Sequence, residues 1–221
     1  MTMQIAIGLY EGFAALDAIG PYQVLTSLPG AEVLFCAERT GIVADEDRML
    51  RVDVTRTFAD TPRPDLLLVP GGLNTRLLAK DGVPIVEWIK AAHPHTTYTT
   101  SVCTGALLLG AAGLLRGLPA TTHWLAYDHL RAFGAEPTEQ RVVIQGKIAT
   151  AAGVSAGIDL ALTLAAEIAG ADVAQAIQLG IEYDPQPPFD TGAPSKAPAP
   201  IRELVTAVMR DAESTLLAEA T

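Results

Sequence analysis

The sequence has few cysteines, few aromatic side chains and no cluster of basic residues. Two cysteines in 221 residues, Cys36 and Cys103, are too few for a disulfide framework and predict a reducing, cytoplasmic setting. Lys and Arg total 15 against 25 Asp and Glu, which gives a net charge of -10. Without a basic stretch the chain is not expected to bind nucleic acid, and its acidity is expected to serve solubility.

Long hydrophobic runs are also missing, because Gly, Thr or a charged residue interrupts each one within about a dozen residues. No membrane partner is therefore expected. The N-terminal segment 1–10 carries no positive charge before its apolar stretch, which is typical of a first strand and not of a signal peptide.

Histidine is scarce, with four residues in the chain. His93 and His95 are spaced to share a metal, but no third ligand is evident nearby. His123 and His129 are six residues apart and do not lie on one helix face as ligands four apart would. No metal site is expected.

Apolar residues make up 49% of the chain, enough for a sizeable core in a single domain over 1–221. Strand-like and helix-like segments alternate, which predicts an α/β fold with a mostly parallel sheet and helices on both faces. Strands are expected at 5–10, 33–37, 51–57 (an edge strand or a hairpin arm), 66–69, 97–102, 141–144 and 147–150. Helices are expected at 14–28, 83–92, 106–115, 123–133, 155–169, 172–179 and 201–219.

Three local features qualify these expectations. Pro21 is expected to distort the first helix or to begin a new one. A short extended piece covers 120–122, and Thr122 is expected to cap the helix that follows. The segment 184–200 contains six prolines and is either a linker or, given its length, a functional loop.

The stretch 99–105 joins an expected strand to an expected buried helix, with Cys103 at the turn. Such a strained strand-to-helix turn presents a nucleophile in α/β enzymes, and a helix N-terminus lowers the pKa of a thiol. The sequence therefore predicts a nucleophile elbow at Cys103. The alternative is a small buried side chain with no chemical role.

Asp17 is a single acid in an apolar segment, where it either caps a helix or is a buried acid with a raised pKa. A protonated Asp17 could hydrogen-bond a thiolate at Cys103 and act as a general acid. Glu11 is the competing carboxylate. Backbone N–H groups of Gly72 and Thr104 could form an oxyanion hole, although the Pro-Gly-Gly sequence ending at Gly72 is also typical of a plain tight turn.

His123 is expected either to bond the backbone at a helix start or to contribute to a pocket. In open parallel sheets, ligands bind outside the carboxyl ends of the strands. The groups expected there are Tyr10 and Glu11, Gly72, and Cys103, so the pocket should lie among them.

With these residues assembled, the chain resembles the PfpI-type superfamily, also called class I glutamine-amidotransferase-like proteins. The resemblance covers nearly the whole length and is carried by the stretches 66–72, 101–105, 120–124 and 150–161. It implies a flavodoxin-like three-layer sandwich, a homodimer and no cofactor. The elbow and the Thr-His-Trp string that ends at residue 124 are also found in the sensor domains of AraC-type regulators.

Within this superfamily the chain looks most like the branch that hydrates isonitriles. The resemblance is carried by Leu-Asp-Ala-Ile-Gly-Pro around Asp17, by Cys-Thr at the elbow where other branches have Cys-His, and by the string 181–190. It implies that Cys103 is the nucleophile, with Asp17 as its acid and Thr104 beside it. The substrate, a small isonitrile, would lie near four further residues, which are Gly72, His123, Val154 and Tyr183.

Two other functions stay open on the sequence. One is a different cysteine chemistry of the superfamily, such as glyoxal hydration or deglycation. The other is a ligand sensor related to AraC-type regulators, which the short acidic segment 202–221 disfavours because it is too small for a helix-turn-helix region. Peptide hydrolysis is disfavoured because the residue after Cys103 is not histidine.

Overall fold

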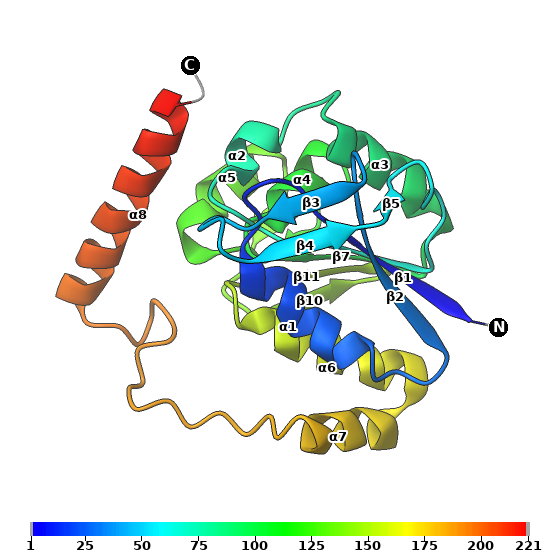
Figure 1. Cartoon of the computed structure of the whole chain (residues 1–221). Coiled ribbons are helices and arrows are strands. Elements are labelled where there is room, and N and C mark those ends of the chain that lie inside the picture. Colours follow the sequence, from blue (N-terminus) through cyan, green and yellow to red (C-terminus); the bar gives the residue numbers. More distant parts are fainter. Residues whose placement is uncertain (1, 220–221) are drawn as a thin grey trace. The chain divides into compact units, whose positions relative to one another are not determined.

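The central sheet has seven strands in the order β10-β11-β7-β6-β1-β2-β5 (Figure 1) in the computed structural model, which describes residues 2–219. Neighbouring strands are parallel except β10 and β11, which form the expected antiparallel hairpin at the sheet edge. The strands are β1 (Met3–Gly8), β2 (Ala31–Ala37), β5 (Arg56–Thr57), β6 (Leu66–Val69), β7 (Tyr98–Val102), β10 (Val142–Gln145) and β11 (Ile148–Ala151).

Helices cover both faces of this sheet, so the predicted three-layer α/β architecture is confirmed (Figure 1). One face packs α1 (Ala15–Leu25), α6 (Ala156–Ala169) and α7 (Ala171–Gly180). The other packs α3 (Pro84–Ala92), α4 (Gly105–Ala111) and α5 (Tyr127–Ala132). Successive side chains of a strand point to opposite faces, so Ile5 and Ile7 of β1 enter the first core while Ala6 enters the second.

Several smaller elements complete the first unit. The antiparallel pair β3 (Gly41–Ala44) and β4 (Arg51–Val54) precedes β5, so the expected strand at 51–57 is a hairpin arm followed by an edge strand. The remaining short elements are α2 (Thr75–Leu78), the 3-10 turns η1 (His93–His95) and η2 (Trp124–Ala126), and the paired strands β8 (Pro119–Ala120) and β9 (Glu136–Pro137).

Several element boundaries differ from the sequence expectation. α4 ends at Ala111 and not at 115, and Gly113 beyond it takes a left-handed φ of 79° that ends a helix readily. The expected helix at 123–133 is a 3-10 turn followed by α5. Thr122 does not cap it, because its hydroxyl donates instead to Cys103 O. Pro21 lies inside α1, which continues through it.

α1 and α6 pack closely because glycine lies at their crossing. A Cβ built at Gly157 of α6 would lie 3.0 Å from Pro21 Cγ, and one at Gly20 of α1 would lie 3.0 Å from Ile158 Cγ1. This packing matters for the site, because α1 carries Asp17 and the turn that enters α6 carries Val154.

The chain divides into two compact units, the first ending at Ile181 and the second covering Glu182–Thr221. The division lies just before the proline-rich segment that the sequence marks as a composition shift. The second unit consists of that segment and α8 (Ala199–Glu219). Among residues 2–219, no helix is long and apolar enough to cross a membrane.

Candidate active site

Cys103 lies at the turn between β7 and α4 with a φ of 56°, which is rare for a non-glycine residue. Three hydrogen bonds hold this conformation. Its N–H donates to Ala151 O at 3.1 Å and to Ala152 O at 2.9 Å, and its carbonyl accepts from Thr122 Oγ1 at 2.8 Å. The predicted strained strand-to-helix turn at Cys103 is therefore present, and its neighbours stabilise it.

Two glycines allow the elbow to approach the end of β6. A Cβ at Gly105 would lie 2.3 Å from Val69 O. One at Gly71 would lie 2.6 Å from Thr104 Oγ1 and 2.8 Å from Asp17 Oδ2. No side chain fits at such distances, so the close contact between the Pro-Gly-Gly turn and the elbow requires glycine at both positions.

Asp17, in the first turn of α1, is fully buried, and its Oδ2 accepts from Gly71 N–H at 2.8 Å. Its Oδ1 has no hydrogen-bond partner in the described part of the chain. Burial raises the pKa of this carboxyl from 3.8 to about 7; the Glu46 charge raises it too, while the Gly71 N–H and the Cys103 side chain lower it. The structure thus brings Asp17 and Cys103 together, with one carboxyl oxygen uncommitted.

The thiol differs from the sequence expectation of a lowered pKa. Burial and the neighbouring Asp17 charge raise the pKa of Cys103 above its usual value, and the backbone N–H groups of Val154 and Thr104 lower it less than these raise it. Both acids therefore resist ionisation. Near pH 7 the carboxyl can therefore gain or lose a proton, while the thiol holds its proton more tightly than a free cysteine does.

Thr104 and Gly72 form a hydrogen-bond network next to Cys103. Gly72 N–H donates to Thr104 Oγ1 at 3.0 Å, and the Thr104 hydroxyl lies 3.0 Å from Gly72 O and 2.9 Å from Thr75 Oγ1. Gly72 therefore directs its N–H to a side chain of the protein and not into an oxyanion hole. The amides that act on the sulfur are those of Thr104, as expected, and of Val154.

The remaining predicted site residues are His123, Val154 and Tyr183. His123 caps η2, where its Nδ1 accepts from Leu125 N–H at 3.4 Å, as expected for a residue at a helix start. Burial lowers its pKa, so the ring is neutral near pH 7. A Cβ at Gly153 would lie 2.9 Å from His123 Cδ2, so His123 lies against the segment that leads to Val154. Tyr183 belongs to the second unit.

Sequence reasoning missed three participants. Glu46 in the β3–β4 loop acts on Asp17 by its charge, and its Oε1 accepts from Leu73 N–H at 2.6 Å. Thr75 and Thr122 position the turn and the elbow. All three come from loops or element ends, where the sequence carries no periodic signal. Among residues 2–219, no three His, Cys, Asp or Glu side chains form a set that could hold a metal ion.

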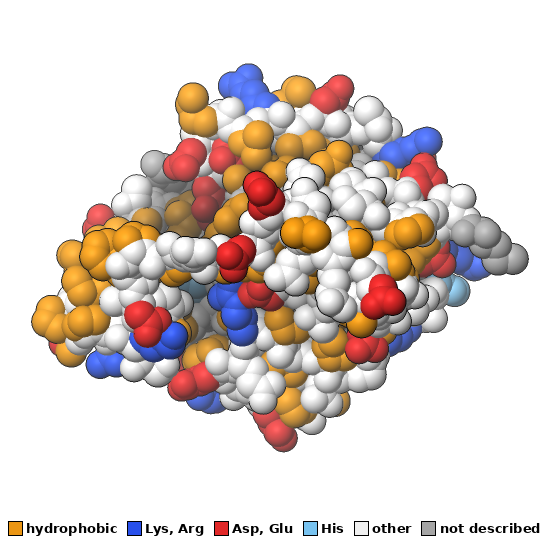
Figure 2. Space-filling view, turned by 90° about the horizontal axis from the view of Figure 1, so that it is seen from below, with side chains coloured by type: hydrophobic (Ala, Val, Ile, Leu, Met, Phe, Trp, Pro, Cys, Tyr) orange, Lys and Arg blue, Asp and Glu red, His pale blue; other side chains and the backbone are white. Residues whose placement is uncertain are grey.

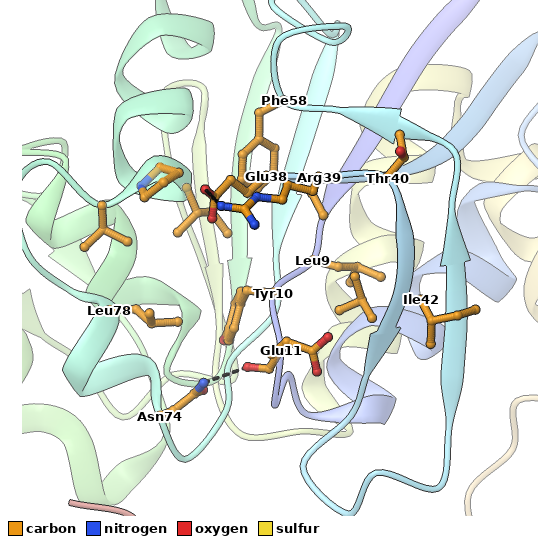
Figure 3. Close-up of a pocket in the computed structure, with 15 residues that line it drawn as sticks. Leu9, Tyr10, Glu11, Glu38, Arg39, Thr40, Ile42, Phe58, Asn74 and Leu78 are labelled. Carbon is orange, nitrogen blue, oxygen red and sulfur yellow. Dashed lines mark hydrogen bonds and ion pairs between the residues drawn. The ribbon is translucent and has the colours of Figure 1, made fainter. Parts of the chain in front are cut away.

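A pocket of about 560 Å³ opens at the carboxyl ends of β1 and β2 (Figure 3). Tyr10 and Glu11 line it as expected, beside Asn74, whose Nδ2 donates to Glu11 O at 2.7 Å. Neither Cys103 nor Asp17 lines this pocket. The expected groups therefore flank two distinct places, the buried Cys103–Asp17 pair and the pocket on the other side of Tyr10.

The fold and the elbow define a class of protein. The sequence model of the DJ-1/PfpI family matches residues 3–167, and the chain belongs to this family. Among individual relatives, it is 44% identical to isonitrile hydratase from Pseudomonas putida over 201 residues, covering 91% of this chain and 87% of that protein.

Solved structures agree with this assignment. The crystal structure of a THiJ/PfpI family protein from Pseudomonas syringae matches with a TM-score of 0.89 at 38% identity, covering 97% of this chain and 90% of that one. Drosophila melanogaster DJ-1beta matches with a TM-score of 0.73 at 18% identity, covering 82% of this chain and 98% of that one, and shares the fold.

Proposed function

We propose that this protein is an isonitrile hydratase, which adds water to R–N≡C to give an N-substituted formamide. The observation that carries the proposal is the buried pair of one thiol and one carboxyl, with Asp17 Oδ1 uncommitted beside Cys103. The Pseudomonas putida relative of that name supports it, since the match extends over 91% of this chain.

In the first step, the Cys103 sulfur attacks the terminal carbon of the isonitrile and forms a C–S bond. A proton from the pair is delivered to that same carbon through Asp17, which is left as a carboxylate. The product is a thioimidate, R–N=CH–S–Cys103. The N–H groups of Thr104 and Val154 stabilise sulfur whenever it carries negative charge, before attack and after release.

In the second step, the Asp17 carboxylate takes a proton from water as the water oxygen bonds to the thioimidate carbon, and passes it to nitrogen. The tetrahedral adduct R–NH–CH(OH)–S–Cys103 then loses its C–S bond. The hydroxyl proton returns to the Cys103–Asp17 pair, and the formamide R–NH–CHO leaves. A carboxyl whose pKa is about 7 suits both directions of proton transfer near neutrality.

Three further proposals accompany this mechanism. Thiol, carboxyl and water supply every atom and proton, so no cofactor or metal is needed. Substrate contacts by Gly72, His123, Val154 and Tyr183 rest on the family resemblance.

The face in Figure 2 shows acidic, basic and apolar side chains interspersed and no large basic patch, consistent with a small-molecule substrate rather than nucleic acid.

A homodimer in the cytoplasm is likewise proposed. The support is a stripe of exposed apolar side chains on α8, which is called the α8 stripe below. Its members are spaced as one helix face requires and are Ile201 (45% exposed), Leu204 (60%), Val205 (39%) and Val208 (58%).

The test of function is hydration of a simple alkyl isonitrile, followed by formation of the formamide. Cys103→Ala should reduce turnover by at least about 10³-fold, and Asp17→Asn by about 10² to 10⁴-fold, because each removes one half of the pair. Cys36→Ala is the matched control, since Cys36 is buried on the opposite side of the sheet, and it should keep turnover once circular dichroism shows a native fold.

Two results would contradict the proposal. One is turnover by Cys103→Ala at the wild-type rate, which excludes a covalent route. The other is a wild-type protein that makes glycolate or lactate from glyoxals and no formamide from isonitriles, which would favour another cysteine chemistry of the family.

A further inference from the structure

Tyr10 lies just beyond β1 and is half-buried, with its hydroxyl behind the Pro-Gly-Gly turn. The hydroxyl donates to Pro70 O at 2.9 Å, with Thr75 Oγ1 a more distant neighbour at 3.4 Å. Burial raises the pKa of the phenol well above its usual value, so the hydroxyl keeps its proton and remains a donor.

The Pro70 carbonyl and the Gly71 N–H are the two ends of one peptide group. Tyr10 donates to the first end, and the second donates to Asp17 Oδ2 at 2.8 Å. A hydrogen bond to a peptide carbonyl polarises the peptide and strengthens donation from its N–H. Tyr10 is thereby connected to Asp17 through a single rigid peptide plane.

We propose that Tyr10 is a positioning residue, which acts on the Asp17 carboxyl through the Pro70–Gly71 peptide. The inference rests on the proposed role of Asp17 and adds a residue that tunes it. The next peptide shows that the turn is fixed in the same way at both ends, since Gly71 O accepts from Ala14 N–H at 2.8 Å and Gly72 N–H donates to Thr104. Little freedom is left for the Pro70–Gly71 peptide to reorient.

The ionisable groups that act on Asp17 are Cys103 from the elbow and Glu46 from the β3–β4 loop. A Tyr10→Phe substitution leaves both in place and removes the donor to Pro70. The Gly71 N–H then donates more weakly, the Asp17 carboxylate is less stabilised, and more alkaline pH is needed to ionise it.

The experiment measures the rate of Cys103 alkylation by iodoacetamide against pH, with peptide mass spectrometry to separate Cys103 from Cys36. The charge on Asp17 changes the reactivity of the adjacent Cys103 sulfur, so the midpoint of the step near pH 7 in this profile reports ionisation of Asp17. The midpoint in Tyr10→Phe should rise by about 0.3 pH unit relative to wild type. Tyr22→Phe is the matched control, because it also removes a phenol hydroxyl, but from a ring that stacks on Phe35, and its midpoint should not move.

3-Fluorotyrosine placed at position 10 tests the opposite direction. Its more acidic phenol is a stronger donor, so the midpoint should fall, and this isosteric change decides the matter if Tyr10→Phe does not fold. An unmoved midpoint in a folded Tyr10 variant, or an equal shift in Tyr22→Phe, would overturn the proposal. The pH profile of alkylation requires no isonitrile. If the wild type lacks hydratase activity, the proposed function is refuted, but the effect of Tyr10 on Asp17 can still be read from this profile.

Discussion

Asp17 is unusual among buried carboxyl groups because its environment satisfies just one of its oxygens. Oδ2 has the Gly71 N–H, while Oδ1 has no partner among the described residues. An unpaired buried oxygen costs free energy, and a carboxyl kept in that condition beside a thiol is suited to exchange a proton with a third group. Gly71 makes this arrangement possible, because its N–H donates to Asp17 Oδ2 and it has no side chain that would collide with the carboxyl.

Gly71→Ala should remove activity and destabilise the fold. The added Cβ would lie 2.6 Å from Thr104 Oγ1 and 2.7 Å from Thr104 N, so either the elbow or the turn must shift. We expect turnover to fall by about 10²-fold and the free energy of unfolding by about 1–3 kcal/mol, measured by isonitrile hydration and urea denaturation.

Gly180→Ala is the control for this substitution. Nothing lies within 4 Å of a Cβ at Gly180, so the variant should match wild type in both measurements. Wild-type turnover by Gly71→Ala would show that the turn tolerates a side chain and that its tight packing is not needed for catalysis.

At the level of elements, the site lies where the ends of two strands and the start of one helix come together. β6 ends in the Pro-Gly-Gly turn, β7 ends at the elbow, and α1 begins with Asp17, while the turn into α6 adds the Val154 amide. Each of these elements contributes buried side chains to one or both of the apolar cores that cover the two faces of the sheet. The second unit differs, because the described apolar cores contain no residue beyond Ile181, and α8 exposes its apolar stripe.

The α8 stripe should be covered by a second copy of the chain. A helix with an apolar face gains little stability alone in water, so it is expected to pack in an oligomer. Sedimentation should give about twice the 23.2 kDa of one chain. Serine at Leu204 and Val208 together should shift the protein toward monomer.

The control for this experiment is serine at Glu203 and Arg210, which lie on the opposite side of the same helix. That variant should remain dimeric at every concentration where wild type does. A monomeric wild type, or a stripe variant that dimerises as tightly as wild type, would refute the role of α8.

For the molecule as a whole, the protonation state of Asp17 affects stability. The folded state raises the pKa of this carboxyl from 3.8 to about 7, so it binds a proton that the unfolded chain has already lost. Protons bound by the folded state alone make stability fall as pH rises. The contribution of this group is complete below about pH 4 and is lost progressively up to about pH 7.

Asp17→Asn should abolish this pH dependence, because asparagine remains neutral and retains an oxygen for Gly71 N–H. The difference in unfolding free energy, variant minus wild type, should grow by about 3 kcal/mol between about pH 5 and about pH 8. Urea denaturation at the two pH values measures it, and the ionisable groups that do not interact with Asp17 cancel in the difference. A constant difference would show that Asp17 ionises normally in the folded state.

The amino-acid sequence determined the layers of this protein and pointed to the residues proposed to react. Strand-like and helix-like apolar patterns alternate along the chain and specify the parallel sheet and its helices. Cys103 at its turn and the isolated Asp17 are polar or reactive residues within apolar segments. These features are local, because periodicity and turn chemistry act over a few residues.

Only the tertiary structure decided how those residues behave. The raised pKa of the Cys103 thiol, the direction of the Gly72 N–H toward Thr104 Oγ1 and the contact of Tyr10 with Pro70 O depend on segments far apart in the chain. Burial and hydrogen-bond partners are set by packing between elements, which local sequence does not encode. For that reason the helix N-terminus predicted an acidic thiol, whereas burial in the folded site raises the pKa of both the thiol and the carboxyl.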